Sequence, residues 1–275
     1  MSASVSSPDR VPAEGPRAVR RDPVVAAGSR GAWNEWARRL LATARGRLAA
    51  VPLVLVAAFA FEAWALWFFG ELANAVSSGY VPVIDAAVLS WLQERASPLW
   101  DRAAVIASFI GAELILPLLV LCGGLFAYQR RWGALLSLVV ITIGSQHLDT
   151  VLKGSFQRVR PNPLPSPLHD ILPAQTFSFP SGHAMVAAAF YLFLAYVAWR
   201  LLPPVWGRLC AALLGLVILF VGLSRLYLGV HYLTDVLAGF AAGAGWTIAT
   251  VVAGHLLALP RRRRALSAGR SASSR

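Results

Sequence analysis

The chain has 275 residues, of which 57% are hydrophobic and only 14% are charged, and its mean hydropathy is +0.60. Soluble domains are nearer half apolar and a quarter charged, so this composition excludes an ordinary water-soluble domain and predicts a protein that lies in a bilayer. The formal charge of +12 does not require a nucleic-acid partner, because the excess arginine flanks apolar segments or lies near the chain ends, where it can contact anionic lipid headgroups.

The chain begins with a segment rich in Pro, Ser, Gly, Ala and Arg, which predicts a disordered, basic cytoplasmic tail over residues 1–48. Within it, residues 33–48 favour a basic amphipathic helix on the membrane surface. We expect the membrane domain over residues 49–259 and a second basic cytoplasmic tail over 260–275.

A membrane-spanning helix needs roughly 20 mostly apolar residues. Six segments qualify, at about 50–69, 103–127, 132–151, 184–201, 208–224 and 234–258. A weaker apolar stretch at 81–93 contains Asp85 and alternates at helical spacing, which predicts a short amphipathic helix at the interface. The predicted fold class is therefore all-α, a bundle of six transmembrane helices with one short interfacial helix.

Arginine placement predicts the orientation, because short cytoplasmic loops and flanks carry excess Lys and Arg. If both termini are cytoplasmic, four basic groups all fall on the inner side: Arg38 to Arg47, Arg130 and Arg131, Arg200 and Arg208, and Arg261 to Arg264. The cationic stretch 153–160 must then face outward, against the rule, which suggests that its charges serve something other than topology. We expect a multi-pass protein of the cell membrane.

Lys153 is the only lysine in the chain, and two other polar clusters fall on the same predicted face. The third span ends outside at Lys153, the fourth begins just after FPSGHA (179–184), and SRLYLGVHYLTD (224–235) connects the fifth to the sixth. Groups that are far apart in sequence therefore converge at the outer surface.

The residue types in these clusters suit a phosphoryl group. A phosphate monoester carries about −1.5 to −2 charges near neutral pH. Arg160 and Arg225 offer planar forks for two oxygens at once, and Lys153 offers a point charge that can pivot. Ser181 and Gly182 stand where a helix begins, and free backbone N–H groups and the helix dipole favour an anion there.

The spacing of His231 and Asp235 suggests a catalytic pair. They are four residues apart at the start of a helix, so they share a face. Asp235 can accept from one ring nitrogen of His231 and leave the other free as a nucleophile. His183, from another helix, is placed to protonate the leaving oxygen.

Together these residues resemble the three signature motifs of the type 2 phosphatidic acid phosphatase superfamily, K-x6-RP, PSGH and SR-x5-H-x3-D. Every fixed position is present: Lys153, Arg160 and Pro161, then Pro180 to His183, then Ser224, Arg225, His231 and Asp235. The resemblance implies a six-helix membrane core and metal-independent hydrolysis through a phosphohistidine. His231 would be the nucleophile, Asp235 its partner and His183 the acid, with Lys153, Arg160, Ser181, Gly182 and Arg225 binding phosphate; no cofactor and no metal is expected.

Several residues have less specific explanations. Lys153 alone could be a helix-end anchor paired with Asp149, and the bond between His231 and Asp235 could be structural. Arg158 has no place in the family pattern, and we expect it to be solvated or to face headgroups. Glu62, in the first span, is either functional or turned toward a polar seam.

Two further patterns concern packing and substrate. Gly239-x3-Gly243 favours close helix packing within this chain. The proline-rich loop 161–180 is long enough to cap a site and select headgroups.

The function that the residues favour is hydrolysis of a phosphomonoester or pyrophosphate of a lipid at the extracytoplasmic face. Undecaprenyl pyrophosphate, phosphatidic acid and phosphatidylglycerol phosphate all satisfy the motifs, which read the phosphate and not the tail. The alternatives are a phosphotransferase that uses a lipid or sugar hydroxyl, a vanadate-dependent haloperoxidase and a non-catalytic protein that binds or moves phospholipids. The oligomeric state is not predicted, and no nucleic-acid partner is expected.

Overall fold

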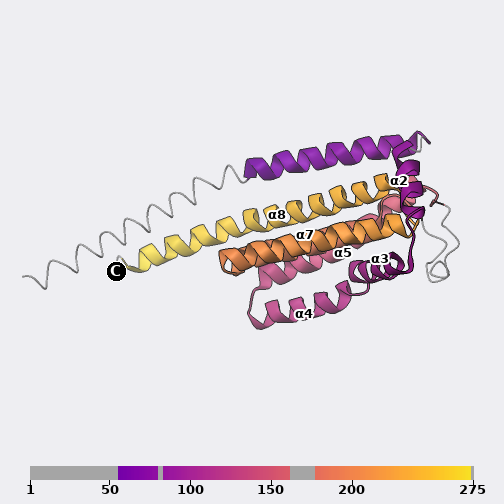
Figure 1. The fold of residues 1–275 in the computed structure, drawn as a ribbon. Coiled ribbons are helices and arrows are strands. Elements are labelled where there is room, and N and C mark those ends of the chain that lie inside the picture. The colour runs from indigo at the N-terminus through magenta and orange to yellow at the C-terminus, as the bar shows by residue number, and fades with distance from the viewer. Residues whose placement is uncertain (1–54, 80–82, 162–176, 274–275) are drawn as a thin grey trace, which may run out of the picture. The chain divides into compact units, whose positions relative to one another are not determined.

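The structure, a computed structural model, describes residues 55–79, 83–161 and 177–273. The regular structure of these residues is entirely helical, which confirms the all-α fold (Figure 1). The predicted tail 1–48 with its surface helix and most of the loop 161–180 lie outside the described residues.

Among the described residues, five helices are long and apolar enough to cross a membrane, and a bent helix pair gives a sixth span if the two helices are taken together. The first of the five is Leu55–Ser77. The other four are α5 (Trp132–Phe156), α6 (Gly182–Leu201), α7 (Pro204–Tyr227) and the part of α8 at Leu233–Leu257. Five of the six predicted spans thus correspond to single helices, with ends shifted by up to eight residues.

The span predicted as continuous over 103–127 is instead broken. It consists of α3 (Pro98–Gly111) and α4 (Ile115–Tyr128), which meet at an angle of 41°. Pro117 explains the break, because a proline cannot donate to the carbonyl four residues earlier and its ring clashes with that carbonyl. The carbonyl four residues before Pro117 belongs to Glu113, which lies between α3 and α4. Hydropathy alone hides the break because the flanking residues are almost all apolar.

Helix α6 is the centre of the bundle. It packs against α3, α5, α7 and α8, and half of its residues are buried. A helix that is apolar all round is expected in such a central place. Its run of small residues, Ala187 to Ala189, is almost inaccessible and lets neighbouring backbones approach.

The glycine pair on α8 packs against α6, as predicted. A Cβ atom at Gly239 would lie 2.6 Å from the carbonyl oxygen of Ser181, and one at Gly243 would overlap the carbonyl oxygen of Met185. Small residues at this spacing allow the close helix contact that is common in membranes. The contact fixes the start of α6 beside the start of α8.

The predicted short amphipathic helix is α2 (Val83–Gln93), which packs against α7 and α8 at the end of the bundle where α8 begins (Figure 1). Its only buried residue is Asp85. The first helix contacts the same end, where Phe69 lies against Phe156 and Phe179.

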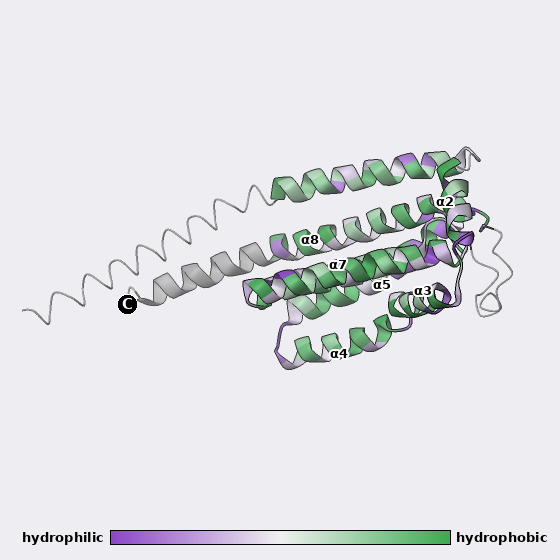
Figure 2. Ribbon diagram, in the orientation of Figure 1, coloured by the Kyte–Doolittle hydropathy of each residue, from purple (hydrophilic) through white to green (hydrophobic). Residues whose placement is uncertain are grey.

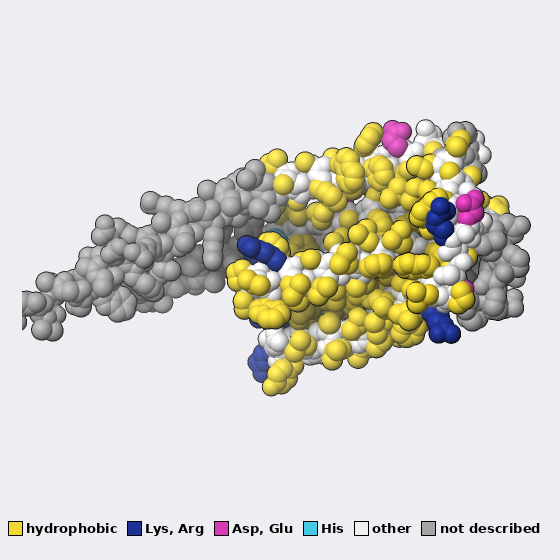
Figure 3. All heavy atoms as spheres, viewed as in Figure 1, with side chains coloured by type: hydrophobic (Ala, Val, Ile, Leu, Met, Phe, Trp, Pro, Cys, Tyr) yellow, Lys and Arg dark blue, Asp and Glu magenta, His cyan; other side chains and the backbone are white. Residues whose placement is uncertain are grey.

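The ribbon coloured by residue hydropathy shows mostly hydrophobic residues along the helices (Figure 2). Apolar side chains cover the visible side of the described helices, and charged side chains gather toward their two ends (Figure 3). This distribution is the one a bilayer requires. The backbone of α8 continues as a helix to Ser273, through most of the segment that we predicted as a tail.

Candidate active site

One cavity of about 1010 Å³ opens beside the ends of α5, α6 and α7. Its apolar walls come from α3, α4 and α5, and its polar end contains cationic and imidazole side chains. Of the predicted site residues, the cavity is lined by Lys153, Arg160, Gly182, His183, Arg225 and His231. Three sequence motifs therefore meet in one pocket.

Lys153 and Arg225 are held by the last turns of α5 and α7. The Nζ atom of Lys153 donates to Oδ2 of Asp149 at 2.8 Å. The side chain of Arg225 is buried; its Nη1 donates to Oγ of Ser108 at 2.5 Å, and its Nε has no partner in the part of the chain that the structure describes. An unpartnered buried donor is costly, and an anion in the cavity would satisfy it.

Arg160 follows α5 and also lines the cavity. Its Nη1 donates to the carbonyl oxygen of Val230 at 3.3 Å. Burial lowers the pKa of Arg160, but a guanidinium stays protonated at neutral pH because its ordinary pKa exceeds 12. The cavity thus keeps a fixed positive charge.

The start of α6 provides the helix terminus that the PSGH motif predicts. Ser181 is the N-cap residue, it is fully buried, and its Oγ has no hydrogen-bond partner among the described residues. Its amide is engaged, because it donates to the carbonyl oxygen of Asp235 at 2.9 Å. At Gly182 a Cβ would lie 2.6 Å from Oδ2 of Asp149 and 2.9 Å from Nζ of Lys153, so a larger residue there would displace these side chains.

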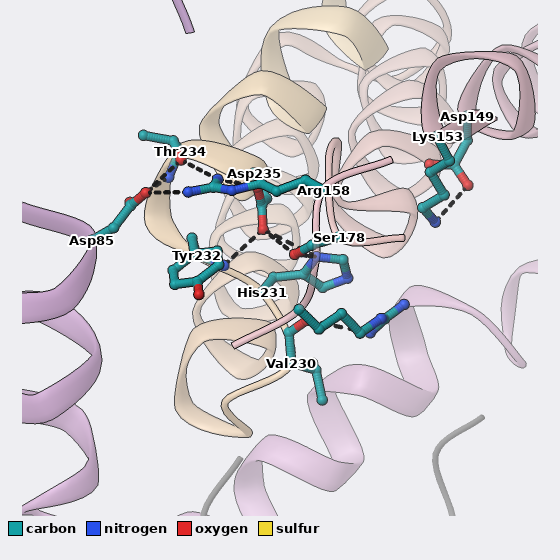
Figure 4. A network of polar contacts seen from close by, with 11 residues as sticks. Asp85, Asp149, Lys153, Arg158, Ser178, Val230, His231, Tyr232, Thr234 and Asp235 are labelled. Atoms are coloured by element: carbon teal, nitrogen blue, oxygen red, sulfur yellow. Dashed lines mark hydrogen bonds and ion pairs between the residues drawn. The ribbon is translucent and has the colours of Figure 1, made fainter. Parts of the chain in front are cut away.

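His231 and Asp235 stand together as predicted, but their contact is indirect. His231 precedes the first turn of α8, and its Nδ1 lies 3.6 Å from Oδ2 of Asp235, beyond normal hydrogen-bond length. The hydroxyl of Ser178 donates to Oδ2 of Asp235 and lies 3.4 Å from Nδ1 of His231 (Figure 4). Ser178 therefore connects the pair, and the sequence motifs did not include it.

Asp235 is also a helix cap. Its Oδ2 accepts from the backbone amide of Tyr232 at 2.8 Å, the reciprocal bond of a capping box at the start of α8. The same hydrogen bond therefore stabilises the start of α8 and orients the Asp235 carboxylate. Burial lowers the pKa of the neighbouring His231 to about 4, although Asp235 opposes this shift. His231 is therefore a neutral imidazole at pH 7, with Nε2 as the ring nitrogen away from Asp235.

The expectation for Arg158 is wrong. Its side chain is only 8% exposed; Nη1 lies 2.5 Å from Oδ1 of Asp235, and Nη2 lies 3.0 Å from Oδ2 of Asp85. Nη1 also donates to Oγ1 of Thr234 at 2.7 Å, and the guanidinium stacks on the ring of Tyr232. Two buried carboxylates thus draw this arginine inward, away from headgroups (Figure 4). Asp85, a carboxylate inside an apolar stretch, was a sign in the sequence that a buried cation is needed. The residue that pairs with it, Arg158, is 73 residues away along the chain.

The anchor alternative for Lys153 is correct in part. The bond to Asp149 forms at the predicted i−4 position, and both side chains line the cavity. Oδ1 of Asp149 is buried and has no partner among the residues described. Glu62 lies outside the cavity, beside Gly245 of α8.

Within the described residues, no group of three or more His, Cys, Asp or Glu side chains gathers in a way that could hold a metal ion. Metal independence itself stays a prediction. The cavity instead concentrates hydrogen-bond donors and fixed cations, which suit an anionic ligand.

The arrangement as a whole defines a multi-pass membrane protein with a cavity lined by cationic and imidazole side chains at one end of its helices. The model of the PAP2 superfamily matches residues 134–257, which contain all three motifs. Phosphatidylglycerophosphatase B of Bacillus subtilis is 38% identical over 176 residues, which cover 62% of this chain and 80% of that protein. The undecaprenyl-diphosphatase of Sulfolobus acidocaldarius is 30% identical over 122 residues, 44% of this chain and 54% of that protein.

The fold agrees with these similarities. The crystal structure of a transmembrane PAP2-type phosphatidylglycerolphosphate phosphatase from Bacillus subtilis superposes with a TM-score of 0.62 and 33% identity, covering 69% of this chain and 93% of that one. The chain belongs to the PAP2 superfamily. It is a membrane lipid phosphatase of the PAP2 type.

Proposed function

We propose that this phosphatase works through a phosphohistidine on His231 and faces the extracytoplasmic side of the membrane. Lys153, Arg160, Ser181, Gly182 and Arg225 bind the phosphate, His183 is the general acid and base, and Asp235 orients His231. The observation that carries the proposal is the convergence of Lys153, Arg160, His183, Arg225 and His231 in one cavity.

In the first step, the lone pair on Nε2 of His231 attacks phosphorus, and the bond between phosphorus and the ester oxygen breaks. The leaving oxygen takes a proton from His183 and departs as an alcohol, or as a lipid monophosphate if the substrate is a diphosphate. Arg160 and Arg225 neutralise the charge that builds up on the equatorial oxygens.

In the second step, a water oxygen attacks phosphorus while His183 accepts one of its protons. The bond between phosphorus and Nε2 breaks, and inorganic phosphate leaves. Neutral His231 is restored with the proton still on Nδ1, where the Ser178–Asp235 pair holds it. General acid and base catalysis by a group such as His183 typically contributes about 10² to 10⁴-fold.

Two observations support the extracytoplasmic orientation. The cavity lies at the end where α5 and α7 finish and α6 and α8 begin, whereas Arg130, Arg131, Arg200 and Arg208 lie at the opposite ends of these helices. Excess arginine favours the cytoplasmic side. The proposal therefore keeps both termini cytoplasmic, with 49–259 as the catalytic domain and 1–48 and 260–275 as tails.

The substrate is a lipid phosphate of the outer leaflet. The apolar walls of the cavity, such as Phe109, Leu116 and Ile143, suit an acyl or prenyl chain next to the phosphate site. Phosphatidylglycerol phosphate and undecaprenyl pyrophosphate are the first substrates to test, because the relatives above are named for them. Phosphatidic acid completes the panel.

The experiment measures release of inorganic phosphate by the purified protein from these three lipids in mixed micelles, with and without EDTA. Rapid acid-free quenching with ³²P-labelled substrate should trap a base-stable, acid-labile phosphoprotein in the unmodified enzyme. We expect His231→Ala to abolish both the label and turnover, and His183→Ala to slow turnover by about 10² to 10⁴-fold. Label that persists in His231→Ala would overturn the assignment of the nucleophile.

Topology and phosphotransfer need separate measurements. Cysteine labelling at Val159 and at Tyr128 with an impermeant reagent should modify only Val159→Cys from outside the cell. Adding glycerol should not divert the phosphoryl group from water. A stoichiometric phosphorylated acceptor would favour the phosphotransferase alternative.

A further inference from the structure

Arg158 occupies a special position in the molecule, because it touches the catalytic pair without touching the cavity. It is absent from the cavity lining, and its side chain is 8% exposed. Its carbonyl oxygen accepts from the amide of Ser178 at 2.8 Å, so its backbone is tied to the segment that carries PSGH. A guanidinium so placed does not contact the substrate phosphate.

The two ends of the Arg158 fork hold two different carboxylates. Nη1 contacts Oδ1 of Asp235, and Nη2 contacts Oδ2 of Asp85. The planar fork fixes both directions at once, which an ammonium on a flexible chain does not. Oδ1 of Asp235 is therefore directed at Arg158, and Oδ2 is left for Ser178 and the His231 side.

Asp85 completes the arrangement from α2. Asp85 is only 1% exposed. Its Oδ1 accepts from the backbone amide of Thr234 at 3.0 Å, and its Oδ2 accepts from the Thr234 hydroxyl at 2.7 Å. It is the one buried residue of α2, a helix whose other contacts come from partly buried Val88 and Leu92. Burying a carboxylate is expensive unless it is paired and hydrogen-bonded, and here Asp85 is paired with Arg158 and bonded to Thr234 in the first turn of α8.

We propose that Asp85 and Arg158 are positioning residues that orient Asp235, and through it the Nδ1 side of His231, so that α2 is a working part of the active site. The proposal rests on the proposed function of the His231–Asp235 pair. Asp85 acts through Arg158, and neither group exchanges a proton with substrate. Loss of either partner lets the Asp235 carboxylate rotate away from Ser178 and His231.

The proposal predicts a change in the rate of the chemical step without a change in substrate affinity. Arg158 and Asp85 lie outside the phosphate cavity, so their loss should lower kcat and leave KM and the inhibition constant of inorganic phosphate within about twofold. We expect Asp85→Asn, which keeps the shape of the side chain and one acceptor oxygen but removes the charge and the second acceptor, to reduce kcat at least tenfold. The matched control is Glu94→Gln just after α2, whose side chain is 72% exposed and which should leave kcat unchanged.

A double-substitution cycle tests the order of action. If Asp85 works only through Arg158, Asp85→Asn should add little to Arg158→Gln, so the two losses should be strongly non-additive. Arg158→Lys keeps the charge but not the fork, and we expect it to lose at least fivefold in kcat. A general loss of packing would instead give additive effects and a raised KM.

The outcomes are distinct from those that test the nucleophile. If the unmodified enzyme forms no phosphohistidine, the proposed function fails and this inference falls with it. If the label forms and Asp85→Asn has a normal kcat, the proposed function stands and the positioning role is refuted. Thermal melting in detergent verifies folding of each variant; should Asp85→Asn not fold, Arg158→Lys decides, and a kcat equal to that of the unmodified enzyme would refute the proposal.

Discussion

The Nδ1 atom of His231 lies 3.6 Å from Oδ2 of Asp235, with the hydroxyl of Ser178 in contact with both. This relationship orients His231 before any substrate arrives, and burial keeps its imidazole neutral although Asp235 opposes that effect. The burial determines how the activity should respond to pH.

Activity should persist to unusually low pH for a histidine nucleophile. Burial lowers the pKa of His231 to about 4, from an ordinary value near 6.5, so the reactive neutral form survives as pH falls until about 4. We expect no loss of kcat/KM near pH 6.5 beyond that caused by the substrate's own phosphate ionisation near 6. A ³¹P titration of the substrate isolates that contribution. A residual acid limb at 6.5 would contradict the burial argument.

Gly182→Ala should impair phosphate binding more than stability. The added methyl would lie within 3 Å of the Asp149 carboxylate and the Lys153 ammonium, so the ammonium must move. Losing one charge-assisted hydrogen bond of about 1.5–3 kcal/mol predicts a decrease in kcat/KM of about 10- to 100-fold. Gly154→Ala, where no heavy atom lies within 4 Å, is the control and should keep kcat/KM. Equal effects of the two changes would argue against the steric explanation.

Asp149→Asn should tighten the binding of inorganic phosphate. Asp149 places a negative charge in the cavity and occupies Lys153 through a 2.8 Å bond. Removing the charge frees the ammonium and relieves repulsion of the anion, which we expect to lower the inhibition constant of phosphate by about tenfold, equivalent to about 1.4 kcal/mol. Weaker inhibition would mean that Asp149 mainly holds Lys153 in its binding position.

Gly243→Ala should lower the thermal midpoint in detergent. Its methyl would overlap the carbonyl oxygen of Met185, a backbone atom that moves only with α6, and overpacking of this kind costs about 1–3 kcal/mol. Gly124→Ala in α4 has open space around it and should be neutral or slightly stabilising, because alanine is the better helix former. A midpoint for Gly243→Ala at or above that of Gly124→Ala would disprove the close packing of α6 on α8.

Sequence reasoning succeeded where the signal was local or followed from helix parity. Apolar length located the spans, and counting them brought Lys153, Gly182 and His231 to one face, where the cavity joins them. The spacing of Gly239 and Gly243 likewise predicted a contact within the chain.

It failed where the answer depended on partners from distant segments. Arg158 looked like a solvated cation because its carboxylate partner, Asp85, lies on a helix whose position no local pattern defines. Ser178 precedes the PSGH motif and gains its meaning only from the fold that sets it against Asp235. The break between α3 and α4 was missed because hydropathy averages over Pro117 and Glu113.

The amide of Ser181 donates to the carbonyl oxygen of Asp235, so the start of α6, where we propose that phosphate binds, is joined to the first turn of α8 by main-chain atoms. Replacing a side chain in either motif does not delete that bond. The relative position of α6 and α8 should therefore be kept when a catalytic side chain is replaced. Inactive variants of this enzyme should therefore bind the uncleaved lipid substrate in its natural position and be suitable for crystallising that complex.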